Sequence, residues 1–140
     1  MDELVSDLNT LLRYETASLM QFMGEATPYV HPDMLRAWQT VQKMASRASG
    51  RAARLTALLT SRRWPALPTV HDSDVAGLQY SRLEALLPRL VQEATQNVAM
   101  VEQAIAHAAS DADITAALTE MLEEHRAELA ALEGCVVPAS

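Results

Sequence analysis

The stretch ASGRAARL, residues Ala48–Leu55, lies in a segment whose apolar side chains recur every three or four residues. This repeat is typical of an amphipathic α-helix with one buried face. The segment opens near Pro32, which suits a first helical turn, and runs to about Arg63. Arg51 lies at the border of the apolar face, so a cation is predicted close to a helix interface. That face consists of Trp38, Val41, Ala45, Ala48, Ala52, Leu55 and Leu59.

The rest of the chain shows the same helical repeat. It predicts helices over about Asp2–Gly24 and Ser81–Ala109, and a last helix that ends before Gly134. Ser110 or Asp111 can cap the last helix. The chain has 140 residues, only four of them Gly, and 49% are hydrophobic, with Ala and Leu dominating. This composition predicts one all-α domain.

The lengths of the connections predict how the four helices are joined. The first and last connections are short, which favours two antiparallel pairs, whereas residues 64–80 are long enough to return along the whole bundle. We therefore predict a four-helix bundle over residues 1–134 and a short tail over residues 135–140. Pro88 lies inside the third helix and is expected to kink or break its first turns.

Charge is distributed unevenly along the chain. The net charge is −7, yet the segment between Asp33 and Asp72 carries +7 and the remainder −14. One interpretation is a helix face that pairs with acidic neighbours; another is a DNA-protecting surface. The excess of acid elsewhere argues against a nucleic-acid partner. The basic stripe in question consists of Arg36, Lys43, Arg47 and Arg54.

Other features bear on the location of the protein. No run reaches 18 apolar residues, so no membrane span and no membrane partner are predicted. The opening MDELVSDLNTLL has three acids and no Lys or Arg, unlike a signal peptide. Cys135 is the single cysteine, which fits a reducing compartment. We therefore expect a cytoplasmic protein.

Four polar residues are predicted on or beside the inner faces of the four helices: Glu15, Arg51, Asn97 and His125. A carboxylate in a dry core must be paired or become neutral, and a guanidinium matches a carboxylate in shape and charge. We hypothesise that Arg51 reaches Glu15, with His125 and Asn97 completing the hydrogen bonds. The alternative is an Arg51 side chain that extends outward into water.

Four stretches resemble the bacterioferritin and wider ferritin-like family: LNTLLRYETASLMQF in the first helix, RAARL in the second, EQAIAHA in the third and LEEHRAELAALE in the fourth. The resemblance implies a bacterial ferritin-like bundle with a long connection between its second and third helices. It places Glu15 at the first metal-bridging glutamate of that family.

The resemblance also implies a degenerate di-iron site. The family uses a Glu from each of two helices and a Glu-x-x-His pair from each of the other two. Of those six ligands, only Glu15 and His125 remain. The other four positions hold Ala48, Arg51, Ala94 and Leu122. Ser49 stands where the resemblance places the haem-ligating Met of bacterioferritins, so no haem is expected. The short fifth helix that helps to close large ferritin cages is not expected either, so we do not expect a 24-subunit shell.

Two functions from different classes remain open. The first is an interaction or assembly bundle that has lost catalysis and binds no metal. It is expected to form a homodimer, and another protein is a second candidate partner. Gly50 on the outer face of the second helix would allow close approach of another backbone. The second is an iron-binding or other metal-binding oxidase or storage protein with an atypical site. Its ligands would be Glu15, Glu93, Glu124 and His125.

Overall fold

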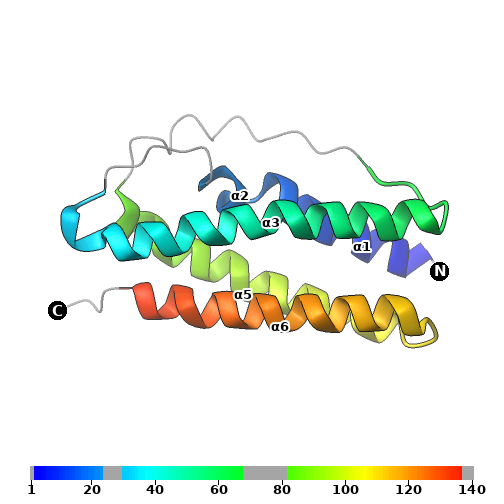
Figure 1. Cartoon of the computed structure of the whole chain (residues 1–140). Coiled ribbons are helices and arrows are strands. Elements are labelled where there is room, and N and C mark those ends of the chain that lie inside the picture. The colour runs from blue at the N-terminus through cyan, green and yellow to red at the C-terminus, as the bar shows by residue number, and fades with distance from the viewer. Residues whose placement is uncertain (1, 24–29, 68–81, 137–140) are drawn as a thin grey trace.

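The computed structural model describes residues 2–23, 30–67 and 82–136, and every regular element in these ranges is helical. The four long helices are α1 (Asp2–Ala17), α3 (Leu35–Ser61), α5 (Leu83–His107) and α6 (Ala112–Cys135). Two short elements, α2 (Leu19–Met23) and the 3₁₀ turn η1 (Pro32–Met34), lie between α1 and α3. Figure 1 shows two layers, with α1, α2 and α3 in one and α5 and α6 in the other. The prediction of an all-α chain with four long helices is confirmed.

The first helix differs from the prediction, because it is interrupted at Ser18 instead of running unbroken toward Gly24. The Leu19 N–H, at the start of α2, donates to both carboxylate oxygens of Glu93 on α5, at 3.1 and 3.4 Å. Side chains from another helix can satisfy the free N–H groups of a helix start. A long-range contact thus stabilises the interruption. Gly24 itself lies outside the described residues.

The C-terminal end of α3 is a Schellman motif. The Trp64 N–H donates to the Leu59 carbonyl at 2.9 Å, and the Arg63 N–H donates to the Thr60 carbonyl at 3.0 Å. This pattern needs a left-handed residue at the turn, and Arg63 supplies it with φ of 59°. An L-residue with a side chain pays a steric cost in that conformation, which glycine avoids.

Pro88 was expected to kink or break the first turns of the third helix, and it does not break them. The α5 helix runs without interruption from Leu83 to His107 and contains Pro88 in its second turn. The residue is exposed, and its missing N–H removes only the bond to the Glu84 carbonyl. A single lost bond near the helix start, on the solvent side, leaves the remaining hydrogen bonds of the helix intact. Ser81, the predicted first residue, lies outside the described ranges.

The last helix begins as predicted and ends later. Asp111 caps α6 by accepting the Ile114 N–H at 3.1 Å. The helix then continues through Gly134 to Cys135, so the predicted end before Gly134 is wrong. Gly134 does not adopt a positive φ, and the left-handed turn that would end the helix at this glycine does not form.

The apolar core is divided into two clusters by a polar layer, which consists of Glu15, Arg51, Asn97, His125 and Glu128. One cluster includes Leu19 of α1–α2, Ala45 of α3, Ala94 of α5 and Leu132 of α6. The other cluster lies on the opposite side of the polar layer. It includes Leu12 of α1, Leu55 of α3, Val101 of α5 and Leu122 of α6. Every long helix therefore passes from one cluster to the other at a polar side chain.

No described helix combines the length and the apolar character that crossing a membrane would require.

Replacing Arg63 by glycine is expected to stabilise the protein. Arg63→Gly should raise the free energy of unfolding by about 0.5–1 kcal/mol, because the left-handed cost disappears while the exposed side chain makes no buried contact. Urea denaturation followed by far-UV circular dichroism measures the change. Ser61→Gly is the matched control at the last helical residue, and it should lower stability by a similar amount. Equal effects of the two changes would contradict this account of the helix end.

Candidate functional site

The polar layer is built at one level of the four long helices. Glu15 comes from α1, Arg51 from α3, Asn97 from α5, and His125 and Glu128 from α6. Each of these side chains lies on the inward face of its helix, and buried apolar residues of the two core clusters lie on either side of the layer. Relative exposure is between 1% and 6% for all five, so hardly any water reaches them.

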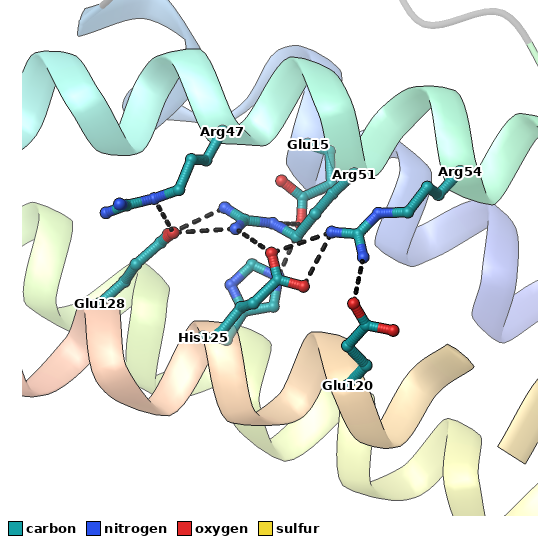
Figure 2. A network of polar contacts seen from close by, with 8 residues as sticks. Glu15, Arg47, Arg51, Arg54, Glu120, His125 and Glu128 are labelled. Atoms are coloured by element: carbon teal, nitrogen blue, oxygen red, sulfur yellow. Dashed lines mark hydrogen bonds and ion pairs between the residues drawn. The ribbon is translucent and has the colours of Figure 1, made fainter. Parts of the chain in front are cut away.

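Arg51 is the centre of this layer, and Figure 2 shows its guanidinium between carboxylates from two other helices. Its two terminal nitrogens donate to the two oxygens of Glu128, both at 2.8 Å. Its Nε donates to Oε1 of Glu15 at 3.0 Å. The fork-to-fork pairing with Glu128 is the strongest common geometry for an arginine and a carboxylate. One side chain therefore joins α1, α3 and α6.

The charge of Arg51 is maintained inside the protein. Burial acts to lower the pKa of Arg51, but the hydrogen bond to Glu128 and the negative charge of Glu15 outweigh it, so the pKa lies above its usual value. The guanidinium is consequently a permanent cation. Two anions held against it form a closed set of charges in the interior.

His125 forms the other contact of Glu15. Its Nε2 lies 2.6 Å from Oε1 of Glu15, the same oxygen that accepts from Arg51. An ionised carboxylate can only accept, which places the imidazole proton on Nε2. The Tyr14 ring packs edge-on against the imidazole at 5.8 Å between centroids. Burial, followed by the charge of Glu15, raises the pKa of Tyr14 above its usual value, so its hydroxyl stays protonated.

The ion pairs continue outward along the seam between α3 and α6. Arg47 donates to Glu128 at 3.2 Å, and Arg54 makes hydrogen bonds of 2.8 and 2.9 Å with Glu124. Farther along, Arg62 pairs with Asp111 at 2.8 Å. Much of the basic segment thus faces acids of α6 within the same chain, as the first interpretation of its charge predicted.

The structure brings three of the predicted residues into contact: Glu15, Arg51 and His125. Asn97 is buried in the same layer, but its Nδ2 has no hydrogen-bond partner among the described residues. Glu124 is partly exposed and pairs with Arg54, with a second, longer approach to Arg51 of 3.5 Å. The outward alternative for Arg51 is wrong, since its side chain is 1% exposed.

Glu93 occupies a different place from the other candidate ligands. Its carboxylate caps the start of α2 and makes no hydrogen bond to Glu15 or His125. Burial raises the pKa of Glu93, and the hydrogen bond from the Leu19 N–H and the charge of Arg89 oppose this shift. Its structural task is therefore to accept the N–H groups that the interruption at Ser18 leaves free.

Glu128 is the residue that the sequence interpretation missed. It follows His125 by three positions and Met121 by seven, so it shares their face of the helix. The predicted stripe used Leu129 instead, which is only half-buried. The available signal was the lone buried cation: Arg51 has more donors than Glu15 can accept, so a second acid had to be nearby.

The residues present do not fit a di-iron centre. Oε1 of Glu15 is already occupied by Arg51 and His125, and a fixed cation lies where the resemblance implies a neutral imidazole. First-row metal ions need carboxylates and imidazoles and would be repelled by this guanidinium. Within the described ranges, no three His, Cys, Asp or Glu side chains are grouped so that they could hold an ion.

No protein-family model matches the chain, and no curated protein or solved structure is significantly similar to it.

Removing the charge of Arg51 is expected to destabilise the protein strongly. Arg51→Met leaves two buried carboxylates without their cation, which should lower the free energy of unfolding by about 3–5 kcal/mol. Thermal and urea denaturation measure the change. The control is Arg54→Met on the same helix, where the side chain is 40% exposed and the loss should stay below about 1 kcal/mol. If both variants lost a similar free energy of unfolding, the buried ion pairs of Arg51 would contribute no more to stability than the exposed pairs of Arg54.

Proposed function

We propose that the chain is a ferritin-like, bacterioferritin-related bundle in which a salt-bridged layer replaces the di-iron centre. In this proposal it acts as an interaction or assembly protein, as a homodimer in the bacterial cytoplasm, and has no oxidase activity. The observation that carries the proposal is the buried fork-to-fork pairing of Arg51 with Glu128, completed by Glu15. An arginine cannot lose its proton, so a fixed cation remains at the level where the resemblance places the metal of that family.

The proposed ferritin-like topology is supported by which residues of neighbouring helices contact each other. Along the α3–α6 seam, Arg47 pairs with Glu128 near one end and Arg62 with Asp111 near the other. Residue numbers rise on one helix as they fall on the other, which is the pattern of an antiparallel pair. Among the helices that the structure describes, α3 and α5 are separated by the longest stretch of sequence, which supports the long connection of a ferritin-like bundle.

The same register supports an antiparallel α1–α5 pair. Gln103 donates to Asp7 at 3.1 Å, and Glu93 accepts from the Leu19 N–H at 3.1 Å. On this register Asn97 lies opposite Glu15, so the polar layer is level across the pair. This placement agrees with the central position that the family gives to its metal ligands.

A specific variant set tests whether Arg51 excludes metal. The quadruple variant Ala48→Glu, Arg51→His, Ala94→Glu, Leu122→Glu restores all six family ligands and should take up two ions per chain. Native protein incubated with Fe(II), Mn(II) or Zn(II) and then desalted should retain far less than one. Elemental analysis measures the metal, and circular dichroism checks that each variant is folded.

The decisive control keeps Arg51 and adds only the three glutamates. If the guanidinium is the reason for exclusion, this triple variant should remain nearly metal-free despite its extra carboxylates. Stoichiometric metal in the native protein would refute the proposal and favour the alternative, an iron-binding or other metal-binding oxidase or storage protein with an atypical site.

Dimer formation is proposed on the outer face of α3. Gly50 is exposed there, and no atom lies within 4 Å of the position that a Cβ would occupy. A second helix could approach this backbone closely, which would compensate for the cost of about 1 kcal/mol of a glycine inside a helix.

A bulky side chain at this glycine is expected to disrupt the dimer. Gly50→Phe should shift the protein from dimer to monomer by sedimentation velocity, because the ring prevents close approach of the second backbone. Gln92→Phe adds the same ring to an exposed position on α5 and should leave the dimer unchanged. A native protein that sediments as a monomer would remove the dimer from the proposal.

A further inference from the structure

A second polar site lies between α1 and α5, beside the interruption at Ser18. A cavity of about 270 Å³ opens there, and both helices contribute charged and polar side chains to its lining. It is separate from the Arg51–Glu128 pair, neither member of which lines it. The lining residues that matter for its chemistry are Arg13, Tyr14, Glu93, Asn97 and Met100.

Two oppositely charged side chains line this cavity without a direct ion pair. The Arg13 side chain is exposed at the mouth of the cavity, and its guanidinium makes no hydrogen bond or ion pair with the residues that the structure describes. Glu93 is hydrogen-bonded to the backbone at the start of α2 but forms no ion pair within 4 Å in the same ranges, and burial raises its pKa. Arg13 and Glu93 also form no ion pair with each other within 4 Å, although both line the cavity. An anion and a cation are therefore held apart in one cavity.

Asn97 adds an unsatisfied donor to the same cavity. It lines the cavity, its residue exposure is 4%, and its buried Nδ2 lacks a partner within the described part of the chain. A buried amide donor without a partner carries an uncompensated desolvation cost, which a hydrogen-bond acceptor on a ligand would remove. Asn97 follows Glu93 by four positions on α5, so the two polar groups share one helix face about a turn apart.

We propose that this cavity binds a small zwitterion of the α-amino-acid class. The ammonium group would lie at Glu93, and the carboxylate would lie at Arg13 and accept from Asn97. Met100 and Ala17 supply apolar surface for an aliphatic side chain. A simple carboxylate would leave Glu93 unpaired beside a second anion, and a simple amine would leave Arg13 and Asn97 unsatisfied. A ligand with both charges can pair with Arg13, Glu93 and Asn97 at the same time.

The size of the cavity limits the ligand further. Pockets for drug-sized molecules measure roughly 300–1,000 Å³, and this one is slightly smaller. Free amino acids with aliphatic or thioether side chains fit this limit, whereas nucleotides and peptides of several residues do not. The Tyr14 hydroxyl, which its raised pKa keeps protonated, is a further donor for the carboxylate.

Isothermal titration and amide-resonance titration of the full chain test the proposal with three matched probes. L-Leucine carries both charges, 4-methylpentanoate lacks the amine, and 3-methylbutylamine lacks the carboxylate. Leucine should bind, with shifts centred on residues near Ser18 and Asn97, and each analogue should bind at least tenfold more weakly. An equal affinity for 4-methylpentanoate would overturn the role of Glu93, and with it the zwitterion.

Variants identify the groups that hold the ligand. Arg13→Gln and Glu93→Gln should each weaken leucine binding at least tenfold; the second keeps an acceptor for the Leu19 N–H, so α2 should remain folded. Arg36→Gln removes an exposed cation on α3 and should change nothing. Absence of binding to the folded native protein by leucine, methionine, valine and alanine would refute the proposal, as would binding that neither lining variant alters. Neither result depends on the metal test above.

Discussion

The structure depends on one constraint: a guanidinium that cannot lose its charge is enclosed in a core that cannot solvate it. Arg51 can remain there only if carboxylates from neighbouring helices come to it, and Glu15 and Glu128 do so from α1 and α6. Three of the four long helices are thereby linked at a single level. Hydrophobic burial is non-directional and tolerates small shifts along a helix, whereas a two-bond fork at 2.8 Å does not. The ion pair therefore specifies the register that the apolar clusters alone would leave loosely defined.

This layer also explains why the protein has two apolar clusters instead of one. Polar side chains at the same level of every long helix interrupt the stripe of leucines, so the residues on either side pack separately. The net stabilisation from such a layer is small, because desolvation of the ions offsets much of their attraction. Its value for the fold is specificity: helices displaced by one turn would bury an acid or a cation without its partner. Evolution from a metal site, as proposed, would retain that specificity while removing the ions.

The two polar regions of the molecule lie next to each other but differ in how completely their polar groups are paired. In the central layer almost every charge is satisfied, and the ion pairs extend outward along the α3–α6 seam. In the cavity between α1 and α5, Arg13 and Glu93 have no ion pair within 4 Å, and the Nδ2 of Asn97 has no hydrogen-bond partner among the described residues. Tyr14 touches both regions, since its ring packs against His125 and also lines the cavity. A ligand in the cavity would therefore lie one side chain away from the charges that hold the helices together.

The sequence by itself determined the approximate limits of the four long helices and the inward positions of Glu15, Asn97 and His125, because these follow from a repeat of 3.6 residues within each segment. The sequence placed Arg51 only at the border of its stripe and left open whether its side chain enters the core or extends into water. It could not select Glu128 over Leu129, since both lie near the edge of the α6 stripe and only the distance to Arg51 separates them. The interruption at Ser18 likewise depends on Glu93, which is distant in sequence. The sequence also could not predict that α6 continues through Gly134, because a glycine permits a left-handed turn without imposing it. Periodicity is a local property, whereas the choice of partner depends on which side chains meet in three dimensions, and only the tertiary structure decided that.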